Sequence, residues 1–322
     1  MNEYYIGVDL GGTKILTAIS DNRGNIIEKK KISTEARKGQ DHVIDNIIRS
    51  IDEVISEAGV AKENITRIGI GTPGPLNIAK GLIYEAPNLN WKNVPLVELL
   101  HEKTGIEIVI ENDANAAALG EKWFGAGRDV DSMIYMTVST GIGGGIIIDK
   151  KILHGVNDTA GEIGHFVIQT DGPICGCGNH GCFEAVASGT AINGISKYIA
   201  AMHPDSLLYQ LVDGDITKID GKVVEDAAIQ GDKFARQIWD DEARYLGIGI
   251  ANLLNVFNVG TIILGGGVMN AWDLINEKMI NTIKQYAFES AYNAVEIRRA
   301  ALGSEVGVKG AIAVAMGDKL LS

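Results

Sequence analysis

Two stretches of the chain repeat one order of strands and turns, and this duplication restricts the possible folds more than any other feature. Residues 4–32 predict three strands separated by a glycine turn, Leu-Gly-Gly-Thr-Lys, and a polar turn, Asp-Asn-Arg-Gly-Asn. Residues 133–155 follow the same scheme, with the glycine run Ser-Thr-Gly-Ile-Gly-Gly after the first strand and the turn Asp-Lys-Lys after the second. A duplicated α/β unit is therefore expected.

Alternating helix and strand patterns follow each triple of strands. In the first half they predict helices over residues 41–58 and 95–104 and strands over residues 67–71 and 107–110. Each half is expected to carry a mixed sheet that starts with two antiparallel hairpins, continues through parallel crossovers and has helices on both faces. We expect the two halves to face a cleft.

The chain crosses between the halves without a low-complexity linker. The alanine-rich segment 115–124 is expected to carry it into the second half, and a helix over about 306–316 is expected to return it to the first. The expected domains are residues 1–114, joined by the C-terminal segment of about 304–322, and residues 115–303, which contain a cysteine-rich knuckle.

Composition and charge exclude several classes of protein. The chain has 322 residues, of which 46% are hydrophobic, as in an ordinary globular protein long enough for two cores. Its net charge of -12 would repel nucleic acids and anionic membranes, so neither is expected as a partner. The first residues lack the regions of a signal peptide, and no apolar run reaches the length of a membrane span, so we expect a cytoplasmic protein.

All three cysteines lie within eight residues of one another, and a histidine precedes them by ten residues. Three thiolates and one imidazole form a closed tetrahedral set that suits structural zinc and leaves no position for an activated water. The predicted ligands are His165, Cys175, Cys177 and Cys182. Ordinary buried thiols beside a core histidine are the alternative, although reduced cytoplasmic thiols favour metal over disulfides. Two carboxylates, Glu162 and Glu184, bracket the cluster and indicate a polyol pocket.

Glycine is abundant, with 40 residues, and two glycine clusters follow strands in the manner of phosphate-binding turns. The candidate residues are Asp9, Gly11, Gly12, Thr13 and Lys14 in the first turn and Thr140, Gly141 and Gly143 in the second. The Asp9 carboxylate is placed to hold a magnesium-bound water. Neither cluster has Walker A or dinucleotide-binding spacing, and a tight hairpin turn explains each one alone. Because the two clusters occupy matching positions in the repeat, phosphate binding is favoured over two unrelated hairpin turns.

Six segments follow one another in an order that points to one family. They are Asp9–Lys14, Glu111–Ala118, Ser139–Gly145, Glu162–His165, the cysteine cluster and Leu264–Gly267. In this order they resemble the ROK family (repressors, open reading frames, kinases) over essentially the whole chain, and in particular its bacterial glucokinases. The glycine turns alone would indicate only the broader superfamily of sugar kinases, Hsp70 and actin.

The resemblance implies a fold and an activity. The fold would be a duplicated actin-like ATPase (ribonuclease H-like) fold, with two mixed-sheet domains around a cleft. The activity would be ATP-dependent phosphorylation of glucose at its 6-hydroxyl, with structural Zn²⁺, with Mg²⁺ accompanying ATP, and with a homodimer or homotetramer as the working form.

The resemblance also assigns roles to single residues. Asp113 matches the family's general base, which accepts the proton of the sugar 6-hydroxyl, with a helix N-cap as the alternative. Asn112 resembles a ligand of a sugar hydroxyl, with an ordinary turn asparagine as the alternative. Glu162, His165 and Glu184 match the remaining sugar contacts, so that one ring nitrogen of His165 binds zinc and the other faces a hydroxyl. Solvated surface glutamates are the alternative for the two carboxylates.

Two further segments resemble ligand-binding loops. Residues 72–94, the longest irregular stretch, resemble a sugar-binding loop in which Gly74 and Asn88 touch the substrate, with ordinary proline turns as the alternative. Trp91 fits either a core or a cleft. A loop on the adenosine side, where a side chain would meet the base, contains Gly265, Gly266 and Gly267. Close packing of a strand on a helix is the alternative there.

Three other functions compete with glucose phosphorylation. A sugar-responsive repressor of the same family would need a DNA-binding domain before the first strand, which starts at Tyr4. A kinase for N-acetylmannosamine, N-acetylglucosamine, mannose or fructose would use the same chemistry with a different pocket. A non-catalytic sugar sensor or zinc-stabilised scaffold would not need Asp9, Asp113 and two phosphate turns. Polyphosphate or ADP would use similar turns as the donor, and ATP is the default expectation.

Overall fold

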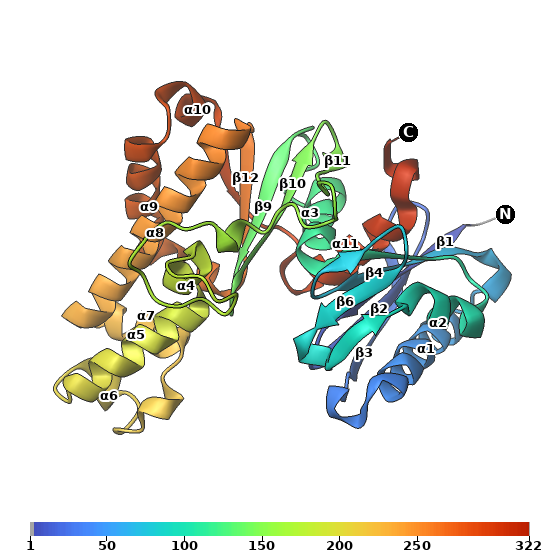
Figure 1. The fold of residues 1–322 in the computed structure, drawn as a ribbon, viewed down its shortest axis with the longest axis horizontal. Coiled ribbons are helices and arrows are strands. Elements are labelled where there is room, and N and C mark those ends of the chain that lie inside the picture. Colours follow the sequence, from blue (N-terminus) through green and yellow to red (C-terminus); the bar gives the residue numbers. More distant parts are fainter. Residues whose placement is uncertain (1–2, 322) are drawn as a thin grey trace. The chain divides into compact units, whose positions relative to one another are not determined.

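The first triple of strands starts a five-stranded sheet in the computed structural model, which describes residues 3–321 (Figure 1). The strands are β1 (Tyr4–Leu10), β2 (Lys14–Ser20), β3 (Ile26–Ser33), β4 (Ile65–Thr72) and β8 (Ile108–Asn112), in the order β3-β2-β1-β4-β8. β2 pairs antiparallel with β1 and β3, whereas β4 pairs parallel with β1 and β8. The expected hairpins and parallel crossovers are therefore present.

The second triple of strands starts a sheet of the same plan. Its strands are β9 (Met133–Val138), β10 (Ile142–Ile148), β11 (Lys151–Ile152), β12 (Thr261–Gly265) and β13 (Glu296–Arg299), in the order β11-β10-β9-β12-β13. β10 pairs antiparallel with β11, and β12 pairs parallel with β13. The matching strand orders confirm the predicted duplication. One boundary was wrong, because β10 begins at Ile142 and Gly143 therefore lies in a strand rather than in the turn.

The contacts within the chain define two units. Unit 1 comprises the chain up to Tyr135, Gly145–Gly161 and the chain from Ala300 onward, and unit 2 comprises Met136–Gly144 and Glu162–Arg299. This grouping keeps residues 115–124 with the residues before them, whereas the sequence led us to expect a domain boundary after residue 114.

Helices cover both faces of the first sheet in unit 1 (Figure 1). They are α1 (Gln40–Glu57), α2 (Leu96–Thr104), α3 (Asp113–Phe124) and α11 (Val306–Met316). Successive side chains of a strand point to opposite faces, so Ile6 and Val8 of β1 pack in the core with α1 and α2, while Tyr5 packs with α11. The expected C-terminal helix over 306–316 is confirmed, and it lies in unit 1.

Glycine allows α11 to approach its neighbours closely. A Cβ atom at Gly69 of β4 would lie 2.2 Å from the carbonyl oxygen of Ala311, and one at Gly310 would lie 2.1 Å from that of Ala116 on α3. The segment that leads into α11 is fixed by Glu121 of α3. The buried carboxylate of Glu121 accepts hydrogen bonds from the backbone N–H groups of Ala301 (3.0 Å) and Leu302 (2.9 Å).

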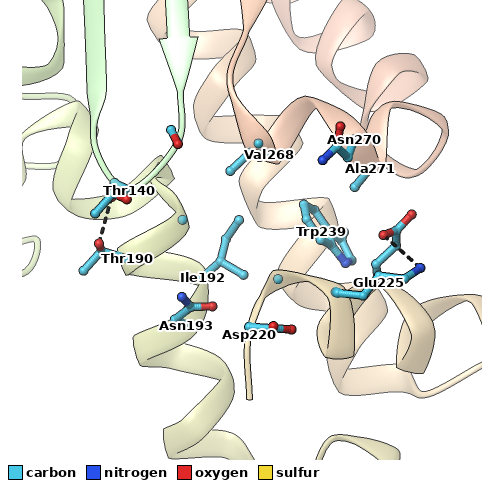
Figure 2. Close-up of a pocket in the computed structure, with 15 residues that line it drawn as sticks. Thr140, Thr190, Ile192, Asn193, Asp220, Glu225, Trp239, Val268, Asn270 and Ala271 are labelled. Atoms are coloured by element: carbon cyan, nitrogen blue, oxygen red, sulfur yellow. Dashed lines mark hydrogen bonds and ion pairs between the residues drawn. The ribbon is translucent and has the colours of Figure 1, made fainter. Parts of the chain in front are cut away.

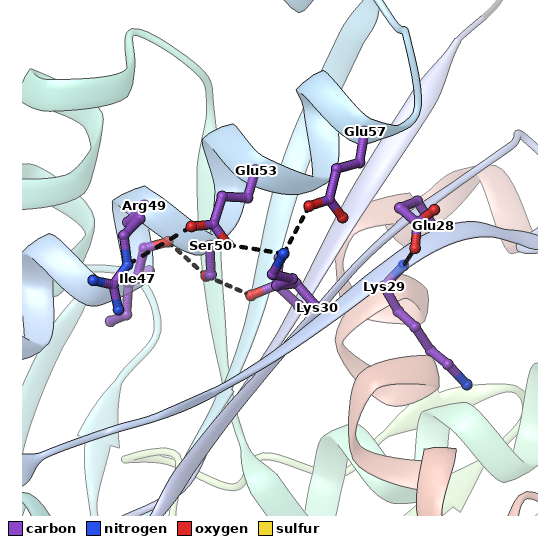
Figure 3. Close-up of polar contacts among 9 residues, drawn as sticks. Glu28, Lys29, Lys30, Ile47, Arg49, Ser50, Glu53 and Glu57 are labelled. Carbon is purple, nitrogen blue, oxygen red and sulfur yellow. Dashed lines mark hydrogen bonds and ion pairs between the residues drawn. The ribbon is translucent and has the colours of Figure 1, made fainter.

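Polar contacts tie α1 to the edge of the same sheet. Lys30 Nζ of β3 lies 2.7 Å from a carboxylate oxygen of Glu57 and 3.4 Å from one of Glu53 (Figure 3). Below this exposed cluster, the hydroxyls of Thr17 and Ser50 are buried and 2.7 Å apart. Exposed ion pairs contribute only about 0–1 kcal/mol, so the buried apolar face of α1 supplies most of the docking energy.

Residues 72–94 are more regular than expected. They contain a small antiparallel sheet of β5 (Leu76–Asn77), β6 (Leu82–Ala86) and β7 (Trp91–Val94), with a 3₁₀ turn at Pro87–Leu89. Trp91 is buried in the core of unit 1, which decides between the two expected locations of this side chain.

Helices make up most of unit 2, and the longest, α8, contacts most of the others (Figure 1). They are α4 (Phe183–Ala187), α5 (Gly189–Met202), α6 (Leu207–Gln210), α7 (Gly221–Ile229), α8 (Lys233–Phe257), α9 (Trp272–Tyr286) and α10 (Glu289–Ala294). Across residues 3–321 no helix has the combination of length and apolar character needed to cross a membrane.

Glu242, on α8, is a buried carboxyl group at 2% exposure. Nothing in the described part of the chain forms a hydrogen bond with its Oε1 atom. Burial raises the pKa of this carboxyl from 4.5 to about 8. Between these two values the unfolded chain loses the proton and the folded chain keeps it, so the free energy of unfolding falls as the pH rises through this range.

Glu242→Gln is therefore expected to stabilise the protein at pH 7.5, by on the order of 1–3 kcal/mol, because glutamine is uncharged in both states. The gain is expected to shrink toward pH 5. Urea unfolding followed by circular dichroism from pH 5 to 8 measures it, with Glu277→Gln, an exposed carboxylate on α9, as the matched control. A gain that does not vary with pH would contradict the assignment of a neutral Glu242.

Candidate active site

The candidate residues of unit 1 begin with Asp9 at the end of β1. Gly307, in the first turn of α11, packs against this carboxylate, since a Cβ atom there would lie 2.6 Å from Asp9 Cγ. Burial raises the pKa of Asp9, and the positive charge of Lys14 opposes this shift. A carboxylate oxygen beside a glycine turn suits a hydrated magnesium ion, so the chemistry of this position fits the expected role.

The first glycine turn is held by its neighbours in unit 1. Gly11 N–H donates to the carbonyl oxygen of Lys14 at 3.0 Å, and the hydroxyl of Thr34 donates to the carbonyl oxygen of Gly11 at 2.6 Å. A Cβ atom at Gly12 would lie 2.8 Å from the carbonyl oxygen of Asn88. The predicted phosphate turn and the predicted sugar loop therefore touch.

The junction of β8 and α3 presents Asp113. The N-cap of α3 is Asn112, whose Oδ1 accepts hydrogen bonds from the backbone N–H groups of Ala114 (2.9 Å) and Asn115 (3.2 Å). Asp113 is the first residue of the helix, and its side chain is exposed while one oxygen accepts the Ala114 N–H at 2.8 Å. The N-cap of α3 is therefore Asn112 and not Asp113, for which the N-cap was the alternative interpretation. The side-chain oxygen of Asn112 is occupied by its hydrogen bonds to the helix backbone.

Next to this junction, the buried side chain of Glu111 is the centre of a set of hydrogen bonds that the sequence analysis did not predict. Glu111, at 4% exposure, accepts at Oε2 from His154 Nε2 (2.7 Å) and at Oε1 from Asn112 N–H and Asn115 Nδ2 (both 3.0 Å). The hydrogen bond to Glu111 raises the pKa of His154. A glutamate at the end of the apolar strand Ile-Val-Ile was a signal that could have indicated a buried partner.

In unit 2 the four predicted metal ligands lie together. Their ligand atoms are all within 4.8 Å of one another. Zinc–sulfur bonds of about 2.3 Å in a tetrahedron place two sulfurs about 3.7 Å apart. The Sγ atoms of Cys177 and Cys182 are 3.6 Å apart, and Cys175 Sγ lies 3.6 Å from His165 Nδ1. The group therefore fits zinc, and all four positions would be filled by protein.

The two carboxylates that bracket the cluster differ in their surroundings. Glu184, in the first turn of α4, accepts a hydrogen bond from the backbone N–H of Ile142 at 2.9 Å, and its other oxygen lies 3.8 Å from Cys175 Sγ. Glu162 is more exposed, and its Oε2 lies 3.9 Å from His165 Nε2. His165 thus directs one ring nitrogen to the cysteines and the other to Glu162. Glu184 connects the metal cluster to the second glycine turn.

The backbone of the cysteine knuckle is tightly folded. Gly181 has a φ of 67°, and a Cβ atom there would lie 1.5 Å from the carbonyl oxygen of Gln169. The next element anchors the knuckle, because Phe183 of α4 stacks on Phe166 at 5.3 Å and fills the space beside Gly249 of α8. The four candidate ligands are therefore fixed to the core of unit 2 through Phe183.

A pocket of about 310 Å³ lies within unit 2, beside the second glycine turn (Figure 2). It is lined by Ser139, Thr140, Gly189, Thr190, Ile192, Asn193, Asp220, Gly221, Lys222, Glu225, Trp239, Gly267, Val268, Asn270 and Ala271. Of the predicted residues, Thr140 and Gly267 are part of it. Thr190 Oγ1 donates to the carbonyl oxygen of Thr140 at 2.7 Å and so holds the turn against α5.

Two side chains of the pocket carry buried polar atoms that form no hydrogen bond with any of residues 3–321. They are the indole nitrogen of Trp239 and the amide oxygen of Asn193. Sequence reasoning did not identify these side chains, because helices far apart in the chain bring them together. The Asp-Gly-Lys start of α7, with Asp220 as N-cap, was the local signal available.

At two predicted glycines, backbone packing explains the residue type. Gly74 has a φ of 92°, and a Cβ atom there would lie 1.9 Å from the carbonyl oxygen of Glu85. A Cβ atom at Gly266 would lie 2.2 Å from the carbonyl oxygen of Val138. At Gly267, by contrast, a Cβ atom would meet no atom of the described residues within 4 Å, so this position opens into the pocket.

Comparison with known proteins extends these observations. The sequence profile of the ROK family matches residues 5–318. A protein named glucokinase from Halalkalibacterium halodurans is 40% identical over 312 residues, which cover 96% of this chain and 94% of that protein. A putative xylose repressor from Caldicellulosiruptor sp. is 33% identical over 98% of this chain and 78% of its own length.

A solved structure shares the arrangement. The crystal structure of a ROK family glucokinase from Streptomyces griseus in complex with glucose and AMPPNP superimposes with a TM-score of 0.81 at 35% identity, covering 97% of this chain and 99% of that one. With the two sheets of matching strand order, this similarity confirms the predicted duplicated actin-like ATPase fold. Nearly the whole sequence thus matches one family profile, and the chain belongs to the ROK family.

Proposed function

We propose that this protein is a sugar kinase that transfers the γ-phosphoryl group of ATP to the 6-hydroxyl of glucose. The observation that carries the proposal is the 40% identity, over nearly the whole chain, to a protein named glucokinase. The relative bound to glucose and AMPPNP supports both substrates. We place the enzyme in the cytoplasm, and the homodimer or homotetramer implied by the resemblance stays a prediction.

In the proposed reaction Asp113 accepts the proton of the 6-hydroxyl while that oxygen attacks the γ-phosphorus in line. The bond from the γ-phosphorus to the bridging oxygen breaks, and ADP leaves. The exposed carboxylate of Asp113 at the first position of α3 supports this role, because the capped turn restricts its movement. The residues proposed to contact the sugar are Gly74, Asn88, Asn112, Asp113, Glu162, His165 and Glu184.

We propose that the two glycine turns bind the phosphates through backbone N–H groups. Mg²⁺ that arrives with ATP would neutralise phosphate charge, and Asp9 is the residue that would hold one of its waters. The residues proposed for nucleotide binding are Asp9, Gly11, Gly12, Thr13, Lys14, Thr140, Gly141, Gly143, Gly265, Gly266 and Gly267. Gly266 acts in this proposal through backbone geometry, since a Cβ atom there would meet the Val138 carbonyl oxygen, and Gly143 contributes as a residue of β10.

The adenosine part of ATP is assigned to the pocket of unit 2. Thr140 of the glycine turn forms one wall, so phosphates bound at the turn would lead into the pocket. Trp239 Nε1, a donor, and Asn193 Oδ1, an acceptor, are buried in the pocket wall without hydrogen-bond partners among residues 3–321, and a nucleoside that reached them would satisfy both. Zinc would be held by His165, Cys175, Cys177 and Cys182, where it would fix the position of the sugar contacts without taking part in phosphoryl transfer.

Asp113→Asn tests the reaction. The variant keeps the size of the side chain but removes the base, so kcat with glucose is expected to fall at least about 100-fold while glucose still binds. A coupled assay of ADP release with glucose, mannose, fructose and the N-acetylhexosamines measures it, and glucose is expected to give the highest kcat/KM. Asp45→Asn, at an exposed ion pair with Lys103 in the same unit, is the matched control. Unchanged turnover would remove Asp113 as the base, and a higher kcat/KM for another hexose would replace glucose as substrate.

Gly267→Val tests the pocket. The new side chain would enter the pocket without meeting described atoms at its Cβ, so the KM for ATP is expected to rise at least tenfold with little change in glucose affinity. Steady-state kinetics with each substrate varied in turn separates the two effects. Gly194→Val, at an open position of α5 outside the pocket lining, is the control. An unchanged KM for ATP would contradict the assignment of the pocket.

Cys177→Ser tests the zinc. The variant removes the exposed ligand, so bound zinc is expected to fall from about one per chain and the KM for glucose to rise about tenfold. Metal analysis, kinetics and thermal unfolding provide the measurements. His180→Asn changes a knuckle histidine outside the ligand set and is expected to keep its zinc. A zinc-free protein with unchanged glucose affinity and unfolding temperature would exclude the proposed role.

A further inference from the structure

The buried Glu111 carboxylate is the centre of a hydrogen-bond group that joins two distant parts of unit 1. Three N–H donors face it, and two of them belong to the start of α3, namely Asn112 N–H and Asn115 Nδ2. The third is His154 Nε2, at 2.7 Å the shortest of the three contacts. Since a carboxylate only accepts, each of these donors finds a matching acceptor.

The backbone around His154 is itself held in place. The carbonyl oxygen of His154 accepts the N–H of Ala160 at 3.1 Å, and Leu153 N–H donates to the carbonyl oxygen of Ile146 at 2.8 Å. Farther along the same loop, Asp158 Oδ2 accepts the N–H of Ile78 at 3.1 Å. The imidazole of His154 therefore extends from a loop that is fixed by hydrogen bonds. For this reason it can restrain the position of Glu111.

We propose that Glu111 and His154 are positioning residues for the transfer reaction: the imidazole fixes Glu111, and Glu111 fixes the turn that presents Asn112 and Asp113. The proposal rests on the function assigned to Asp113 above. Neither residue touches the sugar in this scheme. If His154 Nε2 is removed, one carboxylate oxygen of a nearly buried Glu111 loses its donor, so the side chain must reorient or draw in water. The turn at the start of α3 then loses its restraint.

The negative charge of the Glu111 carboxylate strengthens its hydrogen bond with His154. Glu111 and Asp158 are the acidic groups that raise the pKa of His154, while its partial burial lowers it. Hydrogen bonds to a charged partner contribute more than neutral ones, and misplacing a reacting group by about 1 Å costs on the order of 100-fold in rate. A small loosening of the turn is therefore expected to affect kcat more than folding.

Two matched variants isolate the Nε2 donor. In His154→Gln the amide nitrogen lies as many bonds from Cα as Nε2 does, so the donor to Glu111 is kept. In His154→Asn the amide nitrogen falls short, at the position of Nδ1. Side-chain exposure of His154 is 32%, so both variants are expected to fold. His101→Gln is the control, because His101 Nδ1 bonds the carbonyl oxygen of Ile106 in the same unit at 2.8 Å, and glutamine would break that bond.

Two measurements on the full-length protein test the proposal. In hydrogen–deuterium exchange, a peptide over residues 108–116 is expected to exchange about tenfold faster in His154→Asn and at the wild-type rate in His154→Gln. In kinetics, His154→Asn is expected to lose about tenfold in kcat with the KM for ATP unchanged, whereas His154→Gln retains at least half of kcat. His101→Gln is expected to lower the unfolding temperature without changing kcat.

A double variant separates positioning from general loosening. In the Asp113→Asn background, His154→Asn is expected to change kcat less than about twofold, because there is no base left to position. Equal losses in His154→Gln and His154→Asn, an unchanged exchange rate at 108–116, or a full tenfold loss without Asp113 would each overturn the proposal. If the wild type phosphorylates none of the sugars, the proposed function fails, and the exchange comparison alone still decides whether the pair holds the turn.

Discussion

The close packing of α11 on β4 and α3 is the constraint on which the rest of unit 1 depends. Carbonyl oxygens of Ala311 and Ala116 occupy the places where side chains at Gly69 and Gly310 would stand, so the backbones meet directly. The first turn of the same helix contains Gly307, which packs against the Asp9 carboxylate. One C-terminal helix therefore sets both the position of Asp9 and that of α3, whose first residue is Asp113. Residues from opposite ends of the sequence thus position Asp9 and Asp113, two of the residues proposed for the reaction.

In unit 2 the candidate site residues are held by anchoring contacts and not by close packing of a helix on a sheet. Its polar ligands sit in loops, and loops need anchors if they are to hold a fixed geometry. Phe183 follows the last candidate metal ligand, Cys182, and supplies one anchor by packing against Gly249 of α8. Glu184 supplies another by accepting the N–H of Ile142. The proposed sugar contacts and metal ligands of this unit thus lie within residues 162–184, and Glu184 connects them to the second glycine turn.

Much of this was predictable from the sequence, because the signals were local. The alternating apolar strands, the glycine turns and the Cys-x-Cys spacing each extend over a few residues, and the sheets and the grouping of His165 with the three cysteines follow from them. The cap of α3 was misplaced by one residue, since Asn112 and Asp113 are both good capping residues and only geometry separates them. The two-residue strand β5 has too little pattern to recognise. The contact of Glu111 with His154 spans 43 positions, and the pocket collects residues from several helices, so no local pattern encodes either.

The contact between Gly12 and Asn88 also limits how such an enzyme can be altered. With 2.8 Å from a Cβ position at Gly12 to the carbonyl oxygen of Asn88, even one methyl group would displace the backbone that follows β6. Sequence drift or redesign of the 86–90 loop to accept a bulkier sugar therefore cannot proceed independently of the turn assigned to phosphate. Under the proposed assignment the sugar loop and the phosphate turn touch, so a substitution that alters the binding of one substrate is expected to alter the binding of the other.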